Sequence, residues 1–423
     1  MASWLAFALA VCSAIRAPLP RRVHLTGSAV RMWRYQYLAP MRHLILISLV
    51  SLVFACGCKG DQTPAAIRSP DSPRLLGAPR IVIGDSDTLP GHLLHRVGGG
   101  ALLADGNLAI SVSGSHEVRW FDQQGEFLFA SGSQGSGPGE FGQFSSMRLW
   151  ALSDGSVIVD DSPSRRYHKF AADGGLVWTR TVSLPLRLDG SVWLEGVFAD
   201  TGALIGVSVA GHLAGNPGDL IRSEFRVFSL SPDGSFSHMW PSLQSRTRIV
   251  NEANGVTHYP FLPFSAQELV TGGPSGEMFL LRQGDRLTRI DSLGMEFPVS
   301  GWNPTRQRIT PDMIVGQRDV TLNSVSARRR PLYESLYADD LPLPEYLPVG
   351  SALLWAAPGR LYVEHYRAYG DSSAVRVDVI DVDVGLVATL EVPNLTRILD
   401  VSATHLLGLR TESGVEQVVL FDL

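Results

Sequence analysis

The chain repeats itself early in its length, and this repeat constrains the fold more than any other feature. The segment LADGNLAISVSGSHEVRWFDQQGEFLF (103–129) aligns without a gap with LSDGSVIVDDSPSRRYHKFAADGGLVW (152–178), at a constant offset of 49 residues. An Asp-Gly pair stands at the same place in both copies, at 105–106 and 154–155. A self-match at a fixed period of this length indicates a repeat architecture, in which each copy is one supersecondary unit.

Each copy consists of short runs that alternate apolar and polar residues. In the first copy these runs are residues 108–112, 117–121 and 126–130, separated by glycine-containing turns. This pattern is typical of antiparallel strands joined by tight hairpins. With one more strand before the Asp-Gly turn, each copy makes a four-stranded sheet. Four-stranded sheets repeated every 40 to 50 residues or so are the blades of a β-propeller.

The rest of the chain repeats the strand pattern more weakly. Four further pairs of strands are expected, at 204–209 and 225–228, 277–281 and 287–290, 360–364 and 375–380, and 405–409 and 415–421. We therefore expect an all-β fold, a six-bladed β-propeller over residues 79–423. The last blade ends without an outer strand, and an unpaired sheet edge is a liability. We predict that residues 79–84 pair with residues 415–422 and close the ring.

One stretch carries a resemblance to a known repeat. The segment GSGPGEF (135–141) is followed by an Asp-Gly turn, by Val-Asp-Asp at 159–161, and by Arg166 and Phe170. This order resembles the NHL repeat of six-bladed propellers, many of which are secreted bacterial lipoproteins. The match covers about residues 101–180 and is reduced to turn positions farther on. The resemblance implies a six-bladed, lipoprotein-type propeller, and fold-level likeness of this kind says little about activity.

Residues 1–58 are expected to be a leader. Met41 begins a short basic stretch, and the apolar run LILISLVSLVFA (44–55) has the length of a signal-peptide core. The small residue before Cys56 resembles a lipobox, so Cys56 is the predicted lipid attachment site, with Cys58 as the alternative. The true start of translation is expected at Met41.

Residues 59–78 are rich in Pro, Ser, Ala and Asp and are expected to form a flexible linker between anchor and propeller. No cysteine follows residue 58, so the propeller has neither disulfides nor thiol chemistry. Residues 1–58 hold six of the 36 basic residues and no acid, which leaves 30 basic against 41 acidic residues in 59–423. A net acidic domain argues against nucleic acid as a partner.

Residues 302–347 interrupt the strand pattern. Thr310, Pro311 and Asp312 supply an N-cap, a first-turn proline and a first-turn acid, so a helix is predicted to begin here. We expect an inserted helical hairpin on one face of the ring. Insertions in repeat proteins gather at functional faces, although many only elaborate the fold.

The insertion supplies the candidate binding residues. Three consecutive arginines could bind a carboxylate or phosphate, although such runs are usually just solvated. Exposed aromatic side chains beside them would complete a binding patch. The candidates are Arg328, Arg329, Arg330, Trp302, Tyr333 and Tyr337, with Tyr346 nearby.

The second copy of the repeat carries residues that the first lacks. Asp160, Asp161, Arg165 and Arg166 stand where the first copy has Ser, Val, His and Glu. A pair of carboxylates can serve acid–base chemistry, whereas in NHL-like repeats an acid here braces a turn. We retain these four residues as weak candidates for a function specific to this blade.

Other patterns fall short of a site. Asp378, Asp381 and Asp383 faintly resemble a calcium loop but lack its full set of ligands. The glycine-rich run 131–139 lacks the Gly-Lys ending of a phosphate loop. Seven of the eleven histidines, taken as possible metal ligands, lack the spacing of common metal pairs among themselves: positions 116, 168, 212, 238, 258, 365 and 405. We predict no catalytic residue, no bound metal and no cofactor.

The sequence therefore predicts a monomeric propeller tethered by lipid to a bacterial membrane and facing the periplasm or the exterior. Its expected role is a noncatalytic binding module for an envelope protein or a small ligand. The alternative is a propeller hydrolase or lyase with a divalent metal in the central channel.

Overall fold

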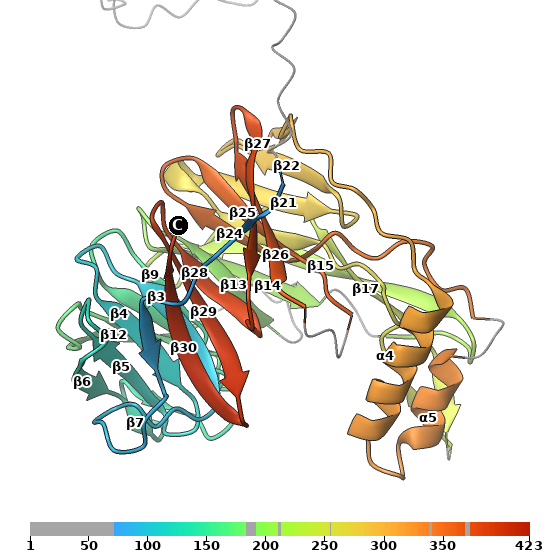
Figure 1. The fold of residues 1–423 in the computed structure, drawn as a ribbon, viewed down its shortest axis with the longest axis horizontal. Coiled ribbons are helices and arrows are strands. Elements are labelled where there is room, and N and C mark those ends of the chain that lie inside the picture. Colours follow the sequence, from blue (N-terminus) through green and yellow to red (C-terminus); the bar gives the residue numbers. More distant parts are fainter. Residues whose placement is uncertain (1–71, 183–191, 210–212, 254, 338–340, 369–372) are drawn as a thin grey trace, which may run out of the picture. The chain divides into compact units, whose positions relative to one another are not determined.

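The computed structural model describes residues 72–182, 192–209, 213–253, 255–337, 341–368 and 373–423, which belong to one compact unit. The predicted leader, both candidate lipid-attachment cysteines and residues 59–71 lie outside the described residues. The described part is a six-bladed propeller, built from six main sheets that follow one another along the chain (Figure 1).

Blades one and two each consist of four consecutive strands, and blade three consists of five. Blade one contains β3 (Val97–Leu102), β4 (Leu108–Val112), β5 (Glu117–Phe121) and β6 (Phe127–Ser131). Blade two contains β9 (Leu149–Ala151), β10 (Val157–Asp161), β11 (Arg166–Phe170) and β12 (Leu176–Thr181). Blade three contains β13 (Val192–Phe198), β14 (Ala203–Val209), β15 (Leu220–Leu230), β16 (Phe236–Met239) and β17 (Leu243–Ile249).

Blades four and five each contain four consecutive strands, and blade six contains three. Blade four contains β20 (Leu269–Gly272), β21 (Met278–Arg282), β22 (Arg286–Ile290) and β23 (Glu296–Pro298). Blade five contains β24 (Gly350–Ala356), β25 (Arg360–His365), β26 (Val375–Asp381) and β27 (Gly385–Val392). Blade six contains β28 (Arg397–Val401), β29 (His405–Glu412) and β30 (Val415–Asp422).

The repeat seen in the sequence reappears in the strand boundaries. Strands β4 and β10 begin and end at equivalent residues of the two copies, and so do β5 and β11. Even the register shift recurs, after Trp120 in blade one and after Lys169 in blade two. The shared sequence therefore encodes shared hairpin geometry, which confirms the prediction for these two blades.

Apolar side chains fill the space between every pair of neighbouring blades. The described residues form six buried apolar clusters, and each cluster draws its members from two adjacent blades. One of them joins blade six to blade one, with Leu407 and Val418 packed against Ile110 and Phe121. Because a sheet buries its two faces against two neighbours, the ring must close to leave no apolar face in water.

Strand β2 (Ile81–Ile83) completes blade six from the start of the ring. It pairs antiparallel with β30, in a register that places Ile83 opposite Val418. This confirms the predicted pairing of residues 79–84 with residues 415–422. The N-terminal side of the domain thus covers the sheet edge that its C-terminal side leaves open.

The linker ends earlier than expected. Strand β1 (Arg74–Leu75) pairs in parallel with β27, and Leu76 is buried among residues of blades five and six. The predicted linker extended to residue 78. Its last residues are instead fixed to the propeller, because Leu76 gains burial in the core and β1 covers the edge of blade five.

The insertion between blades four and five is helical, as predicted. Helix α4 (Pro311–Ser324) begins at Thr310, whose side chain accepts a hydrogen bond from the backbone N–H of Met313. Helix α5 (Arg330–Glu334) and the 3-10 turn η4 (Ser335–Tyr337) follow. In Figure 1 the two helices lie beside β17, and α5 contacts strand β18 (Asn251–Ala253), which pairs with β19 (Val256–His258).

Candidate functional site

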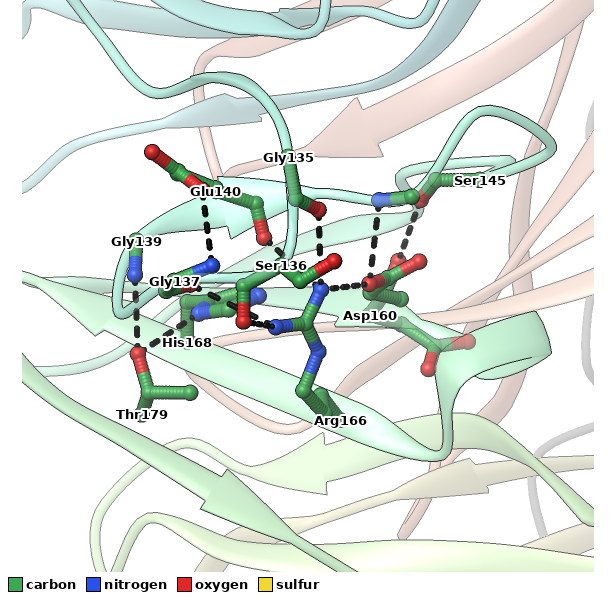
Figure 2. A network of polar contacts seen from close by, with 12 residues as sticks. Gly135, Ser136, Gly137, Gly139, Glu140, Ser145, Asp160, Arg166, His168 and Thr179 are labelled. Carbon is green, nitrogen blue, oxygen red and sulfur yellow. Dashed lines mark hydrogen bonds and ion pairs between the residues drawn. The ribbon is translucent and has the colours of Figure 1, made fainter.

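The unusual residues of blade two form a buried polar network around Arg166 (Figure 2). The guanidinium of Arg166 pairs with the carboxylate of Asp161 at 3.0 Å. The same guanidinium donates to four backbone carbonyls of the glycine-rich loop, those of Gly135, Ser136, Gly137 and Glu140. The Asp161 side chain is fully buried and also accepts from the backbone N–H of Gly142.

The contacts within this network are to backbone groups and to side chains of the same blade, while Oδ1 of Asp161, Nε of Arg166 and Nε2 of His168 are buried without a hydrogen-bond partner among the described residues. Thr179 accepts a hydrogen bond from the backbone N–H of Gly139 and contacts Nδ1 of His168 at 2.9 Å. Burial, and then the charge of Arg166, lower the pKa of His168 to about 4, so its ring is neutral at pH 7. Asp161 and Arg166 therefore hold the GSGPGEF loop onto blade two. The fourth candidate, Arg165, ends the 3-10 turn at Ser162–Ser164 in the left-handed conformation, with φ of 52°.

Asp160 connects blade two to blade three. Burial raises its pKa to about 6, while Arg148, Ser162 and a hydrogen bond from the backbone of Leu194 favour the charged form. Blade five repeats the contact, because Glu364 accepts from the backbone N–H of Ile398 in blade six at 3.0 Å. A carboxylate on the second strand of one blade thus braces the first strand of the next.

Trp302 is not part of an exposed aromatic patch, and this prediction is wrong. Its side chain belongs to the apolar cluster between blades four and five, and its indole N–H donates to Asp378 at 3.0 Å. Asp378 also contacts His365 at 2.9 Å and accepts from Thr389 at 2.9 Å, so it is a structural acceptor. Asp381 accepts hydrogen bonds from the backbone N–H groups of Asp383 and Val384 in the next turn, so it too has a structural role.

A pocket lies between the helical insertion and the segment that follows blade three. Its volume is about 500 Å³, within the range of small-ligand sites. We call it the insertion pocket. It includes residues from β17, from the loop at 258–264, from α4, from α5 and η4, and from the residue after β25. Its polar and aromatic lining includes Arg246, Arg248, Phe261, Tyr333, Tyr337 and Tyr366.

Two arginines stand side by side in this pocket. Arg246 and Arg248 are two residues apart on β17, which places both side chains on the same face of the strand. Their guanidinium carbons lie 4.8 and 3.8 Å from the ring centroid of Phe261. Arg248 also donates to the backbone carbonyl of Tyr259 at 2.7 Å. Burial lowers the pKa of both arginines, and the charge of Arg246 lowers that of Arg248 further.

Tyrosine hydroxyls complete the polar lining. Tyr337 lies 3.0 Å from the hydroxyl of Thr321 on α4, and burial raises its pKa. Burial also raises the pKa of Tyr366, while the nearby charge of Arg246 favours its ionised form. The raised pKa keeps the hydroxyls of Tyr337 and Tyr366 protonated at pH 7, so each can donate one hydrogen bond.

Only one arginine of the predicted run 328–330 lines the pocket. Arg329 lines it, together with Tyr333 and Tyr337. Arg330 is exposed and pairs with Glu334 at 3.1 Å, and Arg328 is exposed outside the lining. Tyr346 lies away from this lining, beside Arg306.

Sequence reasoning missed the residues that face the insertion from the propeller. Arg246, Arg248, Phe261 and Tyr366 were not predicted as a group. A signal was present in the Arg-Thr-Arg alternation of β17, followed by the aromatic run YPFLPF (259–264). Nothing local indicated that these residues would meet the helices.

The described residues give no indication of a metal site or a membrane span. No group of three or more His, Cys, Asp or Glu side chains among them is arranged to hold a metal ion. Within the same part of the chain, no helix combines the length and apolar character that crossing a bilayer requires.

Comparison with known proteins identifies no family. No family model matches the chain, and no curated protein matches it. Among solved structures, an exported protein of Bacteroides fragilis is similar over 82% of this chain and 94% of its own, with 14% identity and a TM-score of 0.46. Staphylococcus aureus virginiamycin B lyase matches over 77% and 94%, with 10% identity and a TM-score of 0.39. A DUF4221 protein of Bacteroides vulgatus matches over 82% and 97%, with 8% identity and a TM-score of 0.38.

Proposed function

We propose that this protein is a noncatalytic ligand-binding propeller of the bacterial cell envelope. In this proposal a lipid on Cys56, or on Cys58, holds the protein at the membrane, and residues 59–71 link this anchor to the propeller. The ligand binds in the insertion pocket. The domain is a monomer in this role and needs no cofactor.

The observation that carries the proposal is the construction of the insertion pocket. A 500 Å³ concave site with aromatic walls lies where an inserted segment meets the body of the fold. The insertion interrupts an otherwise regular series of blades, and its helices supply one wall of the pocket. By contrast, the polar clusters of blade two are occupied by backbone partners and brace the ring.

A small ligand fits this site better than a protein surface does. The pocket is concave and limited in volume, whereas protein interfaces of standard size are broad and bury roughly 800 Å² on each partner. The leader supports an envelope location, because an apolar run of this length before a cysteine is typical of lipoprotein signals.

The proposal is tested by screening small molecules against the purified protein with ligand-observed NMR. Gln317 lines the pocket from α4 and is partly buried. Gln317→Trp fills the space and is expected to abolish binding, while Gln317→Ala enlarges the space and is expected to retain it. Binding that is equal in both variants would place the ligand elsewhere.

The same preparation tests the enzymatic alternative. A divalent metal present in stoichiometric amount by elemental analysis, together with turnover of a bound compound, would replace the binding role by a metal-dependent hydrolase or lyase. Binding without turnover, with no metal required, is the expected result.

A further inference from the structure

We propose that the ligand of the insertion pocket is an organic oxyanion, a carboxylate, phosphate or sulfate carried on a small apolar or aromatic group. Arg246 and Arg248 hold the anionic group. This inference rests on the proposed binding function and assigns the chemical class of its ligand.

The first argument is a charge imbalance in the pocket. The described residues of the lining include three arginines and no aspartate or glutamate. Among the described residues, neither Arg246 nor Arg248 has a carboxylate within ion-pairing distance. The Nε atom of each is buried without a hydrogen-bond partner in the described part of the chain, as it also is in Arg166 and Arg282. An unpaired charge in a partly buried site is costly unless a ligand compensates for it.

The second argument is a comparison with other half-buried arginines of the same protein. Arg148 pairs with Glu195 at 3.1 Å, and Arg282 pairs with Glu296 at 2.8 Å. Arg166 has both Asp161 and four carbonyls. These three arginines of the ring each have an acidic partner, whereas no ion pair among the described residues involves Arg246 or Arg248.

The third argument is the position of the two guanidinium groups. Both lie on one face of β17 over the ring of Phe261, so two cations are held close together at a common surface. Two like charges repel, and the ring compensates for only part of this repulsion. An oxyanion between them would accept from both guanidiniums at once, as in bidentate recognition of carboxylates and phosphates.

The remaining lining suits the rest of such a ligand. Leu332 and Leu336 of the insertion and Phe264 of the loop provide apolar contacts. The phenols of Tyr333 and Tyr366 can donate further hydrogen bonds to oxygen atoms. Arg329 lies exposed in the lining, where it can attract anions from solution.

The test uses isothermal titration calorimetry on the purified protein in Tris-chloride buffer of low ionic strength. The anionic probes are benzoate, phenyl phosphate, phenyl sulfate and inorganic phosphate. Benzamide and benzyl alcohol are the neutral counterparts. We expect the aromatic anions to bind, the neutral compounds to bind at least tenfold more weakly, and added salt to weaken the anions alone. The ranking of the three anions identifies the preferred oxyanion.

Two single variants test the assigned residues. Arg246→Gln and Arg248→Gln are each expected to weaken the preferred anion about tenfold or more, because a charge-assisted hydrogen bond contributes roughly 1.5–3 kcal/mol. Arg286→Gln removes an exposed arginine from β22, outside the pocket lining, and is the charge-matched control. It is expected to leave the affinity unchanged.

The outcomes separate the two proposals. If neutral and anionic probes bind equally, and Gln317→Trp abolishes both, the pocket is a binding site but its ligand is not an anion. If the three arginine variants weaken binding equally, only the overall charge matters and the assigned residues are wrong. If no anion binds at up to about 10 mM, the oxyanion proposal is overturned. If neutral compounds also fail there, the small-ligand function falls with it.

Discussion

Ile83 lies opposite Val418 in the antiparallel pair of β2 and β30, so the two ends of the propeller meet in one sheet. Both side chains are fully buried in the cluster that joins blade six to blade one. Closure of the ring therefore depends on a three-residue strand. The same pair of strands also protects the edge of β30 from pairing with other chains.

The closing strand can be tested by shortening one of its side chains. Ile83→Ala is expected to lower the free energy of unfolding by about 2–4 kcal/mol, because it leaves a cavity at the blade junction. Urea unfolding followed by tryptophan fluorescence measures the change. Leu93→Ala is the control, since Leu93 is 66% exposed and should change stability by less than about 0.5 kcal/mol. Equal effects in the two variants would contradict the role of β2.

The Arg166 network predicts a large loss of stability on removal of the cation. Arg166→Met keeps much of the side chain's bulk but leaves the buried carboxylate of Asp161 without its charged partner. We expect a loss of about 3 kcal/mol or more in chemical unfolding. Arg286→Met is the matched exposed control and is expected to stay within about 0.5 kcal/mol. A small effect of Arg166→Met would mean that the loop at 135–141 holds without the network.

Asp400 predicts a specific dependence of stability on pH. Burial raises its pKa to about 6, while hydrogen bonds from the backbone of Leu102 and Val401 lower it only in part. The folded protein therefore keeps this proton at pH values where the unfolded chain has already released it. Burial of Asp400 therefore lowers the free energy of unfolding by an amount that depends on pH. This loss of stability is absent below about pH 4, grows as the pH rises to about 6, and is constant above that value.

Asp400→Asn should remove this pH dependence. The difference in unfolding free energy between the natural protein and the variant is expected to change by up to about 3 kcal/mol from pH 4 to pH 7, in favour of the variant. Denaturant unfolding at a series of pH values measures it. Since other groups titrate in both proteins, a difference that stays constant over this range counts against the buried carboxyl as the cause.

Removing an arginine of the pocket is expected to cause none of the loss of stability that is expected on removing Arg166. In a buffer free of oxyanions, Arg246→Met is expected to leave the free energy of unfolding within about 0.5 kcal/mol, or to raise it. The variant loses a contact with Phe261 but also loses the repulsion from Arg248 and the cost of partial burial. Thermal and urea unfolding measure the change. A loss as large as that of Arg166→Met would show that Arg246 has a structural role.

Much of the fold could be predicted because local sequence fixes local geometry. Strands β4 and β5 lie where alternation and the Asp-Gly turn placed them, and α4 begins at the predicted Thr310 cap. The pairing of β2 with β30 also followed from a simple count of strands. Hairpins and caps involve residues close in sequence, so their hydrogen-bonding requirements are visible in the sequence itself.

The candidate site could be predicted only in part. Tyr333 and Tyr337 were found because they stand in an unusual insertion, whereas the burial of Trp302 and the facing arginines of β17 were not foreseen. The NHL-like pattern led us to expect that an acid of blade two braces a turn between strands, whereas Asp161 pairs with Arg166 and accepts from Gly142. An exposed and a buried tryptophan look alike in a sequence, because burial depends on distant neighbours.

The repeat, the strand boundaries of the first two blades, the closing strand and the start of the helical insertion could all be predicted from the sequence, since each depends on short-range pattern or on pairing needs. The position of the insertion depends instead on tertiary packing. This packing brings Tyr337 of the insertion near Arg246 of β17 and Tyr366 after β25. These residues belong to three separate segments of the chain, and their proximity results from how the blades and the insertion pack. No local pattern records that packing.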